Sequence, residues 1–311
     1  MENISTISTR FFLLGLVEME KEKYLCIILS FGIYLITMLL SIVILYNVCI
    51  EANLHEPMYL FICNLLFNGM FGSTSLFPKI IIDLLSGSKI ISVAGCFIQS
   101  FCMHTFASVE VFTFTIMAQD RYLAIGEPLR YPTLMTNGKA LNYIGIIWII
   151  AIILVLIPVI MTMKLPLCGK NINNVFCDNM SLVNLACGDS SLNNIFGAIE
   201  TFIVYMVALM IIIYCYIRTF LICLKLSKDA HQKAVSTLVS HLIAFSCFTV
   251  ATLFIVLRYR LNSGSIPMFV HILLSCMGIV TTTIVNPFIY GIRTEALRVK
   301  ILQNLLKIYA R

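Results

Sequence analysis

Charged residues are scarce in this chain. Of its 311 residues only 12% are Asp, Glu, Lys or Arg, whereas 60% are hydrophobic, and the mean hydropathy is +0.97. A soluble domain carries about a quarter charged residues, so this chain cannot cover a water-facing surface, and lipid must be its solvent. The net charge of +6 is spread over short segments between apolar runs, which disfavours nucleic acid as a partner and indicates membrane topology.

The first residues do not have the pattern of a cleavable secretory signal, and none is expected. Residues 1–23 are polar and carry charged side chains immediately before the first apolar run. We therefore expect the first apolar segment to act as its own targeting signal. The charged side chains next to that segment are Glu18, Glu20, Lys21, Glu22 and Lys23.

Seven long apolar segments dominate the rest of the chain. Each has about 20 or more residues, enough to cross roughly 30 Å of hydrocarbon as a helix. The sequence therefore predicts an all-α membrane protein, a seven-transmembrane helix bundle in residues 24–292, between an extracellular tail (1–23) and a cytoplasmic tail with a short amphipathic helix (293–311). The predicted spans are 24–48, 57–84, 93–118, 140–163, 192–223, 236–258 and 267–291.

The distribution of basic residues predicts the orientation. Lys and Arg gather in the third loop on one side and after the last span, and the positive-inside rule places these segments in the cytoplasm. An odd number of spans then puts the amino terminus outside. The first inner connection carries Glu51 and Glu56 without a basic residue, but acidic residues weigh little in the rule. The sequons at Asn3 and Asn179 lie on the outer side and predict glycosylation there.

The cysteines divide in the same way. Most of the 12 lie in or at the ends of spans, where they are expected to be small buried hydrophobic residues. Four lie on the outer side: Cys96, Cys168, Cys177 and Cys187. An even set confined to the oxidising side predicts two disulfides, and the spacing alone allows three pairings.

Two short patterns mark the inner ends of the third and seventh spans. An acid beside an arginine at a membrane boundary is equally well explained by side chains that reach for the interface. Together, in these two spans, the patterns resemble the DRY and NPxxY motifs of the rhodopsin-like receptors, and Cys96 and Trp148 fall where that family keeps a disulfide cysteine and a tryptophan. The residues of the two patterns are Asp120, Arg121, Tyr122, Asn286, Pro287 and Tyr290.

Longer segments narrow the resemblance to the vertebrate odorant receptors. LHEPMYLFICNLL (54–66) resembles their LHxPMYxFLxxLS, and MAQDRYLAIGEPLRY (117–131) resembles MAYDRYVAICxPLxY. KAVSTLVSHL (233–242) is similar to KAxSTCxSHL, and NPFIYGIR (286–293) is similar to NPxIYSLRN. The resemblance covers about residue 24 to about residue 300, and several details are most similar to the receptors of fish.

The resemblance implies a receptor that binds a small odorant inside the bundle and activates a heterotrimeric G protein of the stimulatory olfactory type, which raises cAMP. It also implies a plasma-membrane location, in the cilia of olfactory neurons, with arrestin and receptor-trafficking chaperones as further partners. No cofactor, metal or catalytic residue is expected. The family pairs Cys96 with Cys177, which leaves Cys168 to pair with Cys187.

The same resemblance assigns residues to activation. Arg121 is expected to hold Asp120 at rest and to release it when the inner end opens for the carboxyl-terminal helix of a Gα subunit, and Tyr122 completes the motif. An ordinary packing role is an equal alternative for His241. The other residues expected to act in the open state or to border the cleft are Lys233, His241, Asn286, Pro287 and Tyr290.

Helical spacing predicts the ligand pocket. Two stripes recur at intervals of three or four residues on the third and sixth spans, and each places its side chains on one face of a helix. Ordinary helix packing explains such stripes equally well, and Arg260 suits an interface anchor as well as a partner for a carboxylate ligand. The candidate residues are His104, Ala107, Ser108, Val111, Thr249, Thr252, Leu253, Val256 and Arg260.

Glu110 is the one acid that we expect deep inside a span. A charge there is costly, so a neutral, hydrogen-bonded carboxyl is favoured over a sodium or proton site. Gly69 supports this interpretation, because it stands where the family usually has an aspartate ligand of sodium. The other departures from the family pattern are Ser41 for Asn, Gln119 for Tyr, Gly126 for Cys and Thr249 for Tyr.

Other membrane proteins fit the sequence less well. An odd number of spans without a repeat at half length disfavours a transporter or channel. The absence of HExxH, paired-aspartate and Ser/His patterns disfavours a membrane enzyme. The seventh span has no lysine for a retinal Schiff base, and the PMY and SHL segments disfavour a receptor for a peptide or lipid.

Overall fold

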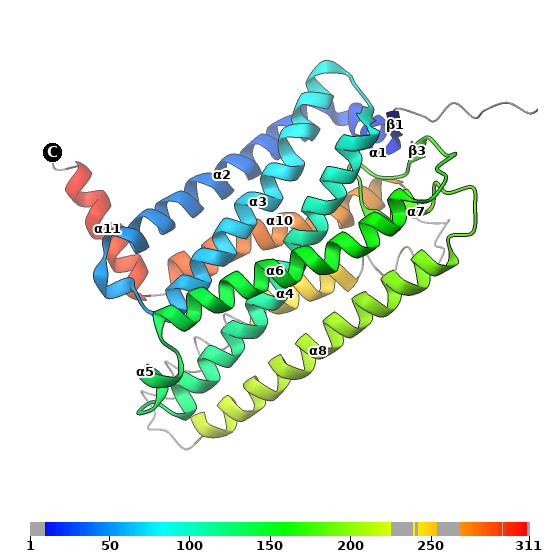
Figure 1. Ribbon diagram of the computed structural model, residues 1–311. Coiled ribbons are helices and arrows are strands. Elements are labelled where there is room, and N and C mark those ends of the chain that lie inside the picture. Colours follow the sequence, from blue (N-terminus) through cyan, green and yellow to red (C-terminus); the bar gives the residue numbers. More distant parts are fainter. Residues whose placement is uncertain (1–9, 225–238, 240–241, 254–267, 294, 310–311) are drawn as a thin grey trace, which may run out of the picture.

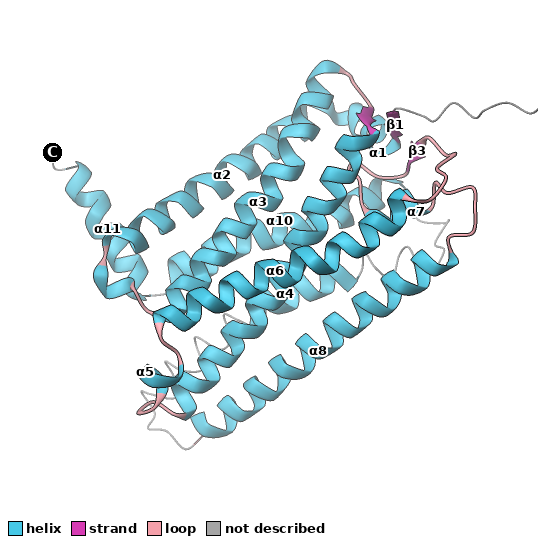
Figure 2. Ribbon diagram, in the orientation of Figure 1, coloured by secondary structure: helices cyan, strands magenta, loops and turns pink. Residues whose placement is uncertain are grey.

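The computed structural model describes residues 10–224, 239, 242–253, 268–293 and 295–309. Long helices lie side by side and make up most of this part (Figures 1 and 2). Helices are the expected element because a chain in lipid must satisfy its backbone hydrogen bonds within each segment. The long helices are α2 (Lys23–Ile50), α3 (Pro57–Ser86), α4 (Val93–Gly126), α6 (Asn137–Met163), α8 (Ser191–Cys223) and α10 (Met268–Arg293).

Among the described residues, five helical segments are long and apolar enough to cross a membrane. They correspond to the first five predicted spans, and the all-α fold class is confirmed. Of the sixth predicted span, the structure describes the helical segment Leu242–Leu253, and α10 occupies the seventh. The third span is longer than predicted: α4 continues past residue 118 to Gly126, so the Asp120–Arg121 pair lies on the helix itself.

Local sequence signals set several helix ends. Pro57 occupies the first turn of α3, where its missing N–H costs no hydrogen bond, and the helix stops at Gly87, whose φ of 68° favours glycine. The Ser92 hydroxyl caps α4 by accepting from the Gly95 N–H, and the Thr136 hydroxyl caps α6 in the same way.

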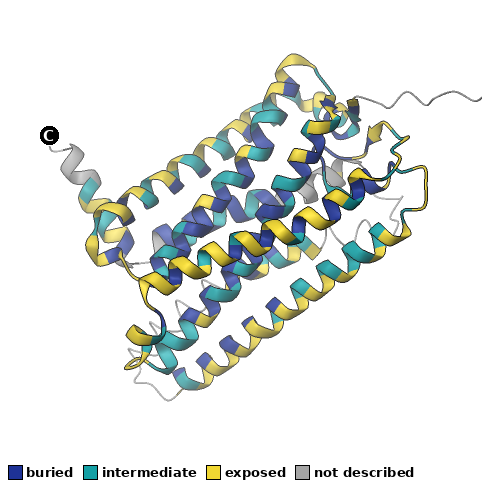
Figure 3. Cartoon of the chain, viewed as in Figure 1, coloured by how far each residue is buried: buried dark blue, intermediate teal, exposed yellow. Residues whose placement is uncertain are grey.

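The burial pattern of α2 shows that its solvent is lipid. Thr37 and Ser41 are 0% and 1% exposed, whereas Leu39 and Ile42 are 54% and 51% exposed. A helix in water would place these residues the other way round. Exposed positions also run along the outer faces of α6 and α8 (Figure 3). These polar side chains therefore face the interior of the bundle, away from lipid.

One end of the bundle carries a small sheet. Strand β1 (Arg10–Leu13) pairs antiparallel with β2 (Ile90–Ser92) and parallel with β3 (Asn171–Ile172). Helix α1 (Leu14–Met19) and the 3-10 turn η1 (Glu20–Glu22) then lead into α2. Lys89 donates to Glu20, and this hydrogen bond lowers the pKa of the Glu20 carboxyl.

Residues 10–22 of the predicted amino-terminal tail belong to the folded structure. Phe11, Leu13 and Leu16 are 0–1% exposed, because the strand and the helix turn alternate side chains into the bundle. Gly15 lies so close to the following loop that an added Cβ would sit 2.6 Å from the Asn174 carbonyl carbon. In the sequence, the charged residues near residue 20 concealed that residues 10–19 form a short, mainly apolar segment, which we call the amino-terminal plug.

The opposite end carries α5 (Tyr131–Leu134), the 3-10 turn η2 (Ala52–Leu54) and the terminal helix α11 (Glu295–Tyr309). Helix α11 packs on α2: Lys300 lies 2.9 Å from the Glu51 carboxylate, and Asn304 donates to Asn47 over 2.8 Å. Leu297 is fully buried on the apolar face of α11. The acidic residue that departed from the charge rule, Glu51, is thus the partner of a basic residue in the tail.

Candidate functional site

The two disulfides of the structure join Cys96 to Cys177 and Cys168 to Cys187, the pairing that the family resemblance implies. Cys96 lies in the first turn of α4, and Cys177 lies between β3 and the short helix α7 (Asn179–Val183). The Cys177 N–H also donates to the Gln99 side chain over 2.9 Å. We call this end of the bundle the disulfide end.

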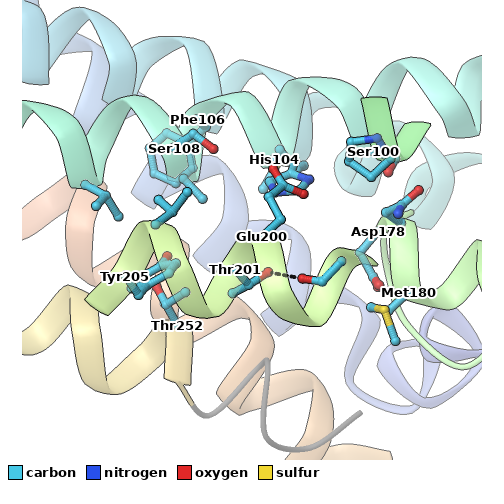
Figure 4. Close-up of a pocket in the computed structure, with 18 of the residues that line it drawn as sticks. Ser100, His104, Phe106, Ser108, Asp178, Met180, Glu200, Thr201, Tyr205 and Thr252 are labelled. Atoms are coloured by element: carbon cyan, nitrogen blue, oxygen red, sulfur yellow. Dashed lines mark hydrogen bonds between the residues drawn. The ribbon is translucent and has the colours of Figure 1, made fainter. Parts of the chain in front are cut away.

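A cavity of about 210 Å³ lies next to this loop, between α4, α6, α8, α10 and the segment Leu242–Leu253. Asp178 and Met180 line it at the disulfide end (Figure 4). Its wall is mainly apolar, with a few polar groups, which is the usual character of a small-molecule site. The lining side chains used below are Ser100, His104, Phe106, Ala107, Ser108, Val111, Phe176, Asp178, Glu200, Thr201, Tyr205, Phe248 and Thr252.

The predicted stripe on the third span lies on the cavity wall in full: His104, Ala107, Ser108 and Val111 all line it. The stripe on the sixth span is only partly placed there. Thr252 lines the cavity together with Phe248, one helical turn before it.

Two of the predicted sixth-span residues miss the cavity. Leu253 is 45% exposed on the outside of its helix, and Thr249 is absent from the described lining. The cavity face runs through Phe248 and Thr252, and a shift of one residue rotates a helical side chain by about 100°. Val256 and Arg260 lie outside the described residues.

Sequence reasoning missed the contribution of α8. Glu200 and Thr201 line the cavity from one side of this helix together with Tyr205, which lies about one turn further along (Figure 4). Glu110 was expected to be the one acid deep inside a span, but Glu200 also lies within the fifth span. The signal was present in the sequence: a single acid in an apolar helix marks a functional position.

Glu110 joins three helices deeper in the bundle. Its carboxyl group is 0% exposed and accepts from the Asn68 amide on α3 over 2.8 Å and from the Asn286 amide on α10 over 2.6 Å. Asn68 also donates to the Phe106 carbonyl over 3.0 Å. Asn68 is the neighbour of Gly69, so the second span still supplies a polar partner, one residue before the position where the family keeps its aspartate.

A second network ties α3, α4 and α6 together. The Trp148 indole donates to Asn64 over 2.9 Å, and the Asn64 amide donates to the Thr113 hydroxyl over 2.8 Å. The rings of Phe67 and Phe71 meet Trp148 edge-on, with centroids 5.9 and 5.8 Å away. Polar groups in lipid must find partners within the protein, so these contacts fix how the three helices pack.

Asp120 is held from two sides at the end of the bundle opposite the disulfides. The Arg121 guanidinium donates to Oδ2 over 2.6 Å, and the Tyr131 hydroxyl of α5 donates to Oδ1 over 2.7 Å. Asp120 is 1% exposed. Burial raises the pKa of Tyr131, and the neighbouring carboxylate raises it further, so the phenol keeps the proton that it donates. We call this region the Arg121 end.

Three further predicted activation residues lie on α10. Pro287 is inside α10, Tyr290 is 3% exposed in the core, and Asn286 is occupied by its bond to Glu110. Lys233 and His241 lie outside the described residues.

Comparison with known proteins identifies the family. Residues 29–308 match the family model described as "Olfactory receptor". The chain is 32% identical to human olfactory receptor 6Y1 over 94% of its own length and 90% of that protein. It is 33% identical to mouse olfactory receptor 4B13, covering 93% of this chain and 94% of the relative, and 35% identical to human olfactory receptor 52B6, covering 95% and 88%. The chain belongs to the olfactory receptor family.

Membership of the olfactory receptor family completes the description of the fold. Its members are G-protein-coupled receptors with a seven-transmembrane bundle, so this receptor is a multi-pass plasma-membrane protein and not an enzyme. The described helices fit that bundle, with the segment Leu242–Leu253 as part of the sixth span. The likeness to fish receptors stays a prediction, as the relatives named above are from mouse and human.

The structure describes one of the two predicted glycosylation sites of this olfactory receptor, Asn179. Asn179 lines the cavity, and its side-chain oxygen is buried without a hydrogen-bond partner among the described residues. Ser181 of the same sequon is buried and donates to Asp178 over 2.6 Å. Asn179 as a whole is half-buried, and its glycosylation stays a prediction. Asn3 lies outside the described residues.

Proposed function

We propose that this olfactory receptor binds a small odorant in the cavity and activates a stimulatory G protein at the Arg121 end, which raises cAMP. The observation that carries the proposal is that one helix, α4, supplies both sites: His104 and Ser108 line the cavity, and Asp120 and Arg121 form the pair at the other end. Between them Glu110 bonds α4 to α3 and α10. Movement of α4 against these helices is the physical link that we infer.

The size of the cavity limits the ligand. A protein cavity of about 150 Å³ holds a molecule of benzene. The volume here is about 210 Å³, so we infer a ligand of roughly six to ten non-hydrogen atoms. Such a molecule favours the active state only by the difference between its affinities for the two states.

We place the disulfide end outside the cell and the Arg121 end in the cytoplasm. Disulfides form in oxidising compartments, and the basic residues of the third loop and of the tail belong inside. In olfactory neurons the receptor would then present its cavity to the exterior of the cilium. Arrestin and trafficking chaperones would meet the cytoplasmic end and the assembling chain, respectively.

The direct test is a cAMP reporter in transfected cells that display the receptor. We expect a subset of a panel of small alcohols, aldehydes, amines and acids to raise cAMP with saturable dose dependence. Arg121→Ala should reach the surface but lose the response by about tenfold or more, because the charged group that contacts the G protein is gone. Silence to the whole panel at normal surface level, or an undiminished response in Arg121→Ala, would contradict the proposal.

Tyr131→Phe should raise ligand-independent signalling several-fold. The variant removes the hydrogen bond from Tyr131 to Asp120 and leaves the two from Arg121 intact, so the resting state loses part of its stabilisation. Basal cAMP, normalised to surface level, measures the effect. Tyr143→Phe, on the exposed face of α6, is the matched control and should stay at the wild-type level. A basal level at or below wild type in Tyr131→Phe would show that the contact does not restrain the receptor.

A further inference from the structure

The cavity is acidic for its size. Among the described residues that line it, Asp178 and Glu200 carry carboxyl groups and none is a lysine or arginine. Its remaining polar groups include His104, Ser108 and Thr201, and the rest of its wall is mainly apolar. A cavity of this composition attracts a ligand with a positive end and an apolar body, and it repels a carboxylate.

Asp178 and Glu200 differ in how many hydrogen bonds their carboxyl groups already make within the protein. Asp178 accepts from the Ser181 N–H over 2.8 Å, from the Ser181 hydroxyl over 2.6 Å and from the Asn174 amide over 3.1 Å. Asp178 therefore caps α7 and contributes its negative charge from the edge of the cavity. These three hydrogen bonds take most of the roughly four acceptor sites of its carboxylate.

Glu200 is the acid that a ligand can use. Its Oε2 atom is buried and has no hydrogen-bond partner among the described residues. The side chain extends from α8 toward His104 on α4, across the space that the cavity occupies (Figure 4). A buried carboxyl oxygen without a partner is costly in lipid, and acids in such places pair with other groups or serve as counter-ions of ligands.

Aromatic rings complete the surroundings of Glu200. Phe106, Phe176, Tyr205 and Phe248 line the same cavity. Ring faces attract a cation, most strongly where water is excluded, and their edges pack well against a short alkyl chain. The same aromatic side chains can therefore contact both the ammonium group and the alkyl chain of a small amine.

We propose that the ligand of this receptor is a small primary amine, bound as its ammonium ion with Glu200 as the counter-ion. The inference rests on the proposed function and names its ligand class. It also replaces the anionic ligand that Arg260 suggested from the sequence, a residue outside the described part of the chain. The ammonium would donate to Glu200, and the alkyl chain would lie against the aromatic side chains.

Three probes with five carbons each test which head-group charge the cavity prefers: pentylamine, 1-pentanol and pentanoic acid. In the cAMP assay we expect the amine to act at a concentration about tenfold or more below the alcohol, since a charge-assisted hydrogen bond is about twice as strong as a neutral one. Pentanoic acid should be the weakest. Glu200→Gln should cost the amine about tenfold or more and change the alcohol little, because the amide keeps the shape and hydrogen-bonding capacity. Glu22→Gln, at an exposed acid outside the cavity, should change nothing.

Two further measurements distinguish a loss of ligand binding from misfolding: the response of the Glu200→Asp variant, and ligand binding to the purified receptor. The shorter acid should keep the preference for the amine over the alcohol, although with weaker affinity. In purified receptor, pentylamine should raise the melting temperature of the wild type and not of Glu200→Gln.

The outcomes separate this inference from the proposed function. A wild-type response to the alcohol or the acid without a preference for the amine would overturn the ligand class and leave the receptor function standing. An equal loss for amine and alcohol in Glu200→Gln would do the same, because it would show a structural role for Glu200. Silence to the three probes and to the wider panel, at normal surface level, would overturn both.

Discussion

Cys177→Ser is expected to abolish surface display and signalling. The bond to Cys96 closes a separation of 81 residues, which corresponds to roughly 4 to 5 kcal/mol of loop-closure entropy. That is close to the whole stability of a marginal fold. Both sulfur-bearing side chains are 0% exposed, so the variant also leaves a hydroxyl and a thiol buried beside the cavity. We expect surface antibody staining to fall about tenfold or more, with the protein retained inside the cell.

Two control variants make this result specific. Cys49→Ser, at an exposed free cysteine, should be displayed like the wild type. Cys187→Ser opens the second disulfide, which spans 19 residues and corresponds to about 3 kcal/mol, so its loss should be smaller. Normal display with a full response in Cys177→Ser would show that the bond is dispensable. Equal losses in all three variants would point to a general sensitivity to serine.

Glu110→Leu should also remove the receptor from the surface, whereas Glu110→Gln should not. Leucine leaves the buried Asn68 and Asn286 amides without the acceptor they share, at about 1–3 kcal/mol for each amide. Glutamine has nearly the same shape. Its oxygen accepts from one amide, and its NH₂ group can donate to the other asparagine once that amide has turned over. Asn68 and Asn286 have side-chain oxygens without other partners among the described residues, which are available for that bond.

The comparison of these two variants also tests whether the Glu110 carboxyl is neutral, as the sequence analysis favoured. Surface level and ligand response are measured in parallel, in sodium and in a sodium-free medium. A neutral, hydrogen-bonded Glu110 predicts a displayed, responsive Glu110→Gln variant and no effect of sodium in either protein. A sodium effect in the wild type that disappears in Glu110→Gln would show instead that a cation occupies the site. Normal display of Glu110→Leu would show that the three-helix contact is not needed for folding.

Several parts of the fold and of the site could be predicted because they depend on neighbours in the sequence. The predicted spans follow from runs of apolar residues, and the stripe from His104 to Val111 follows from helical spacing on one helix. Of the stripe predicted on the sixth span, Thr252 lines the cavity, whereas Leu253 faces outward. Spacing alone does not say which face of an apolar helix meets its neighbours.

The role of Glu200 could not be predicted from the residues around it in the sequence. Its neighbours in sequence are apolar or small, and the cavity exists only because α8 packs beside α4. The same is true of the amino-terminal plug, whose partners Ile90–Ser92 and Asn171–Ile172 lie far along the chain. Contacts of this kind depend on the folded path, which local composition does not specify.

The sequence by itself determined the solvent of this protein, its helical class and its family, because hydropathy, helix spacing and the DRY and NPxxY patterns are properties of short segments. It also determined which cysteines pair, once the family resemblance was used. Only the tertiary structure decided which polar groups meet: Glu110 with two asparagines, Asp120 with Tyr131, and Glu200 with an open cavity. The physical reason is that lipid offers no hydrogen bonds, so each polar side chain is paired or left open by the packing of helices that are distant in sequence.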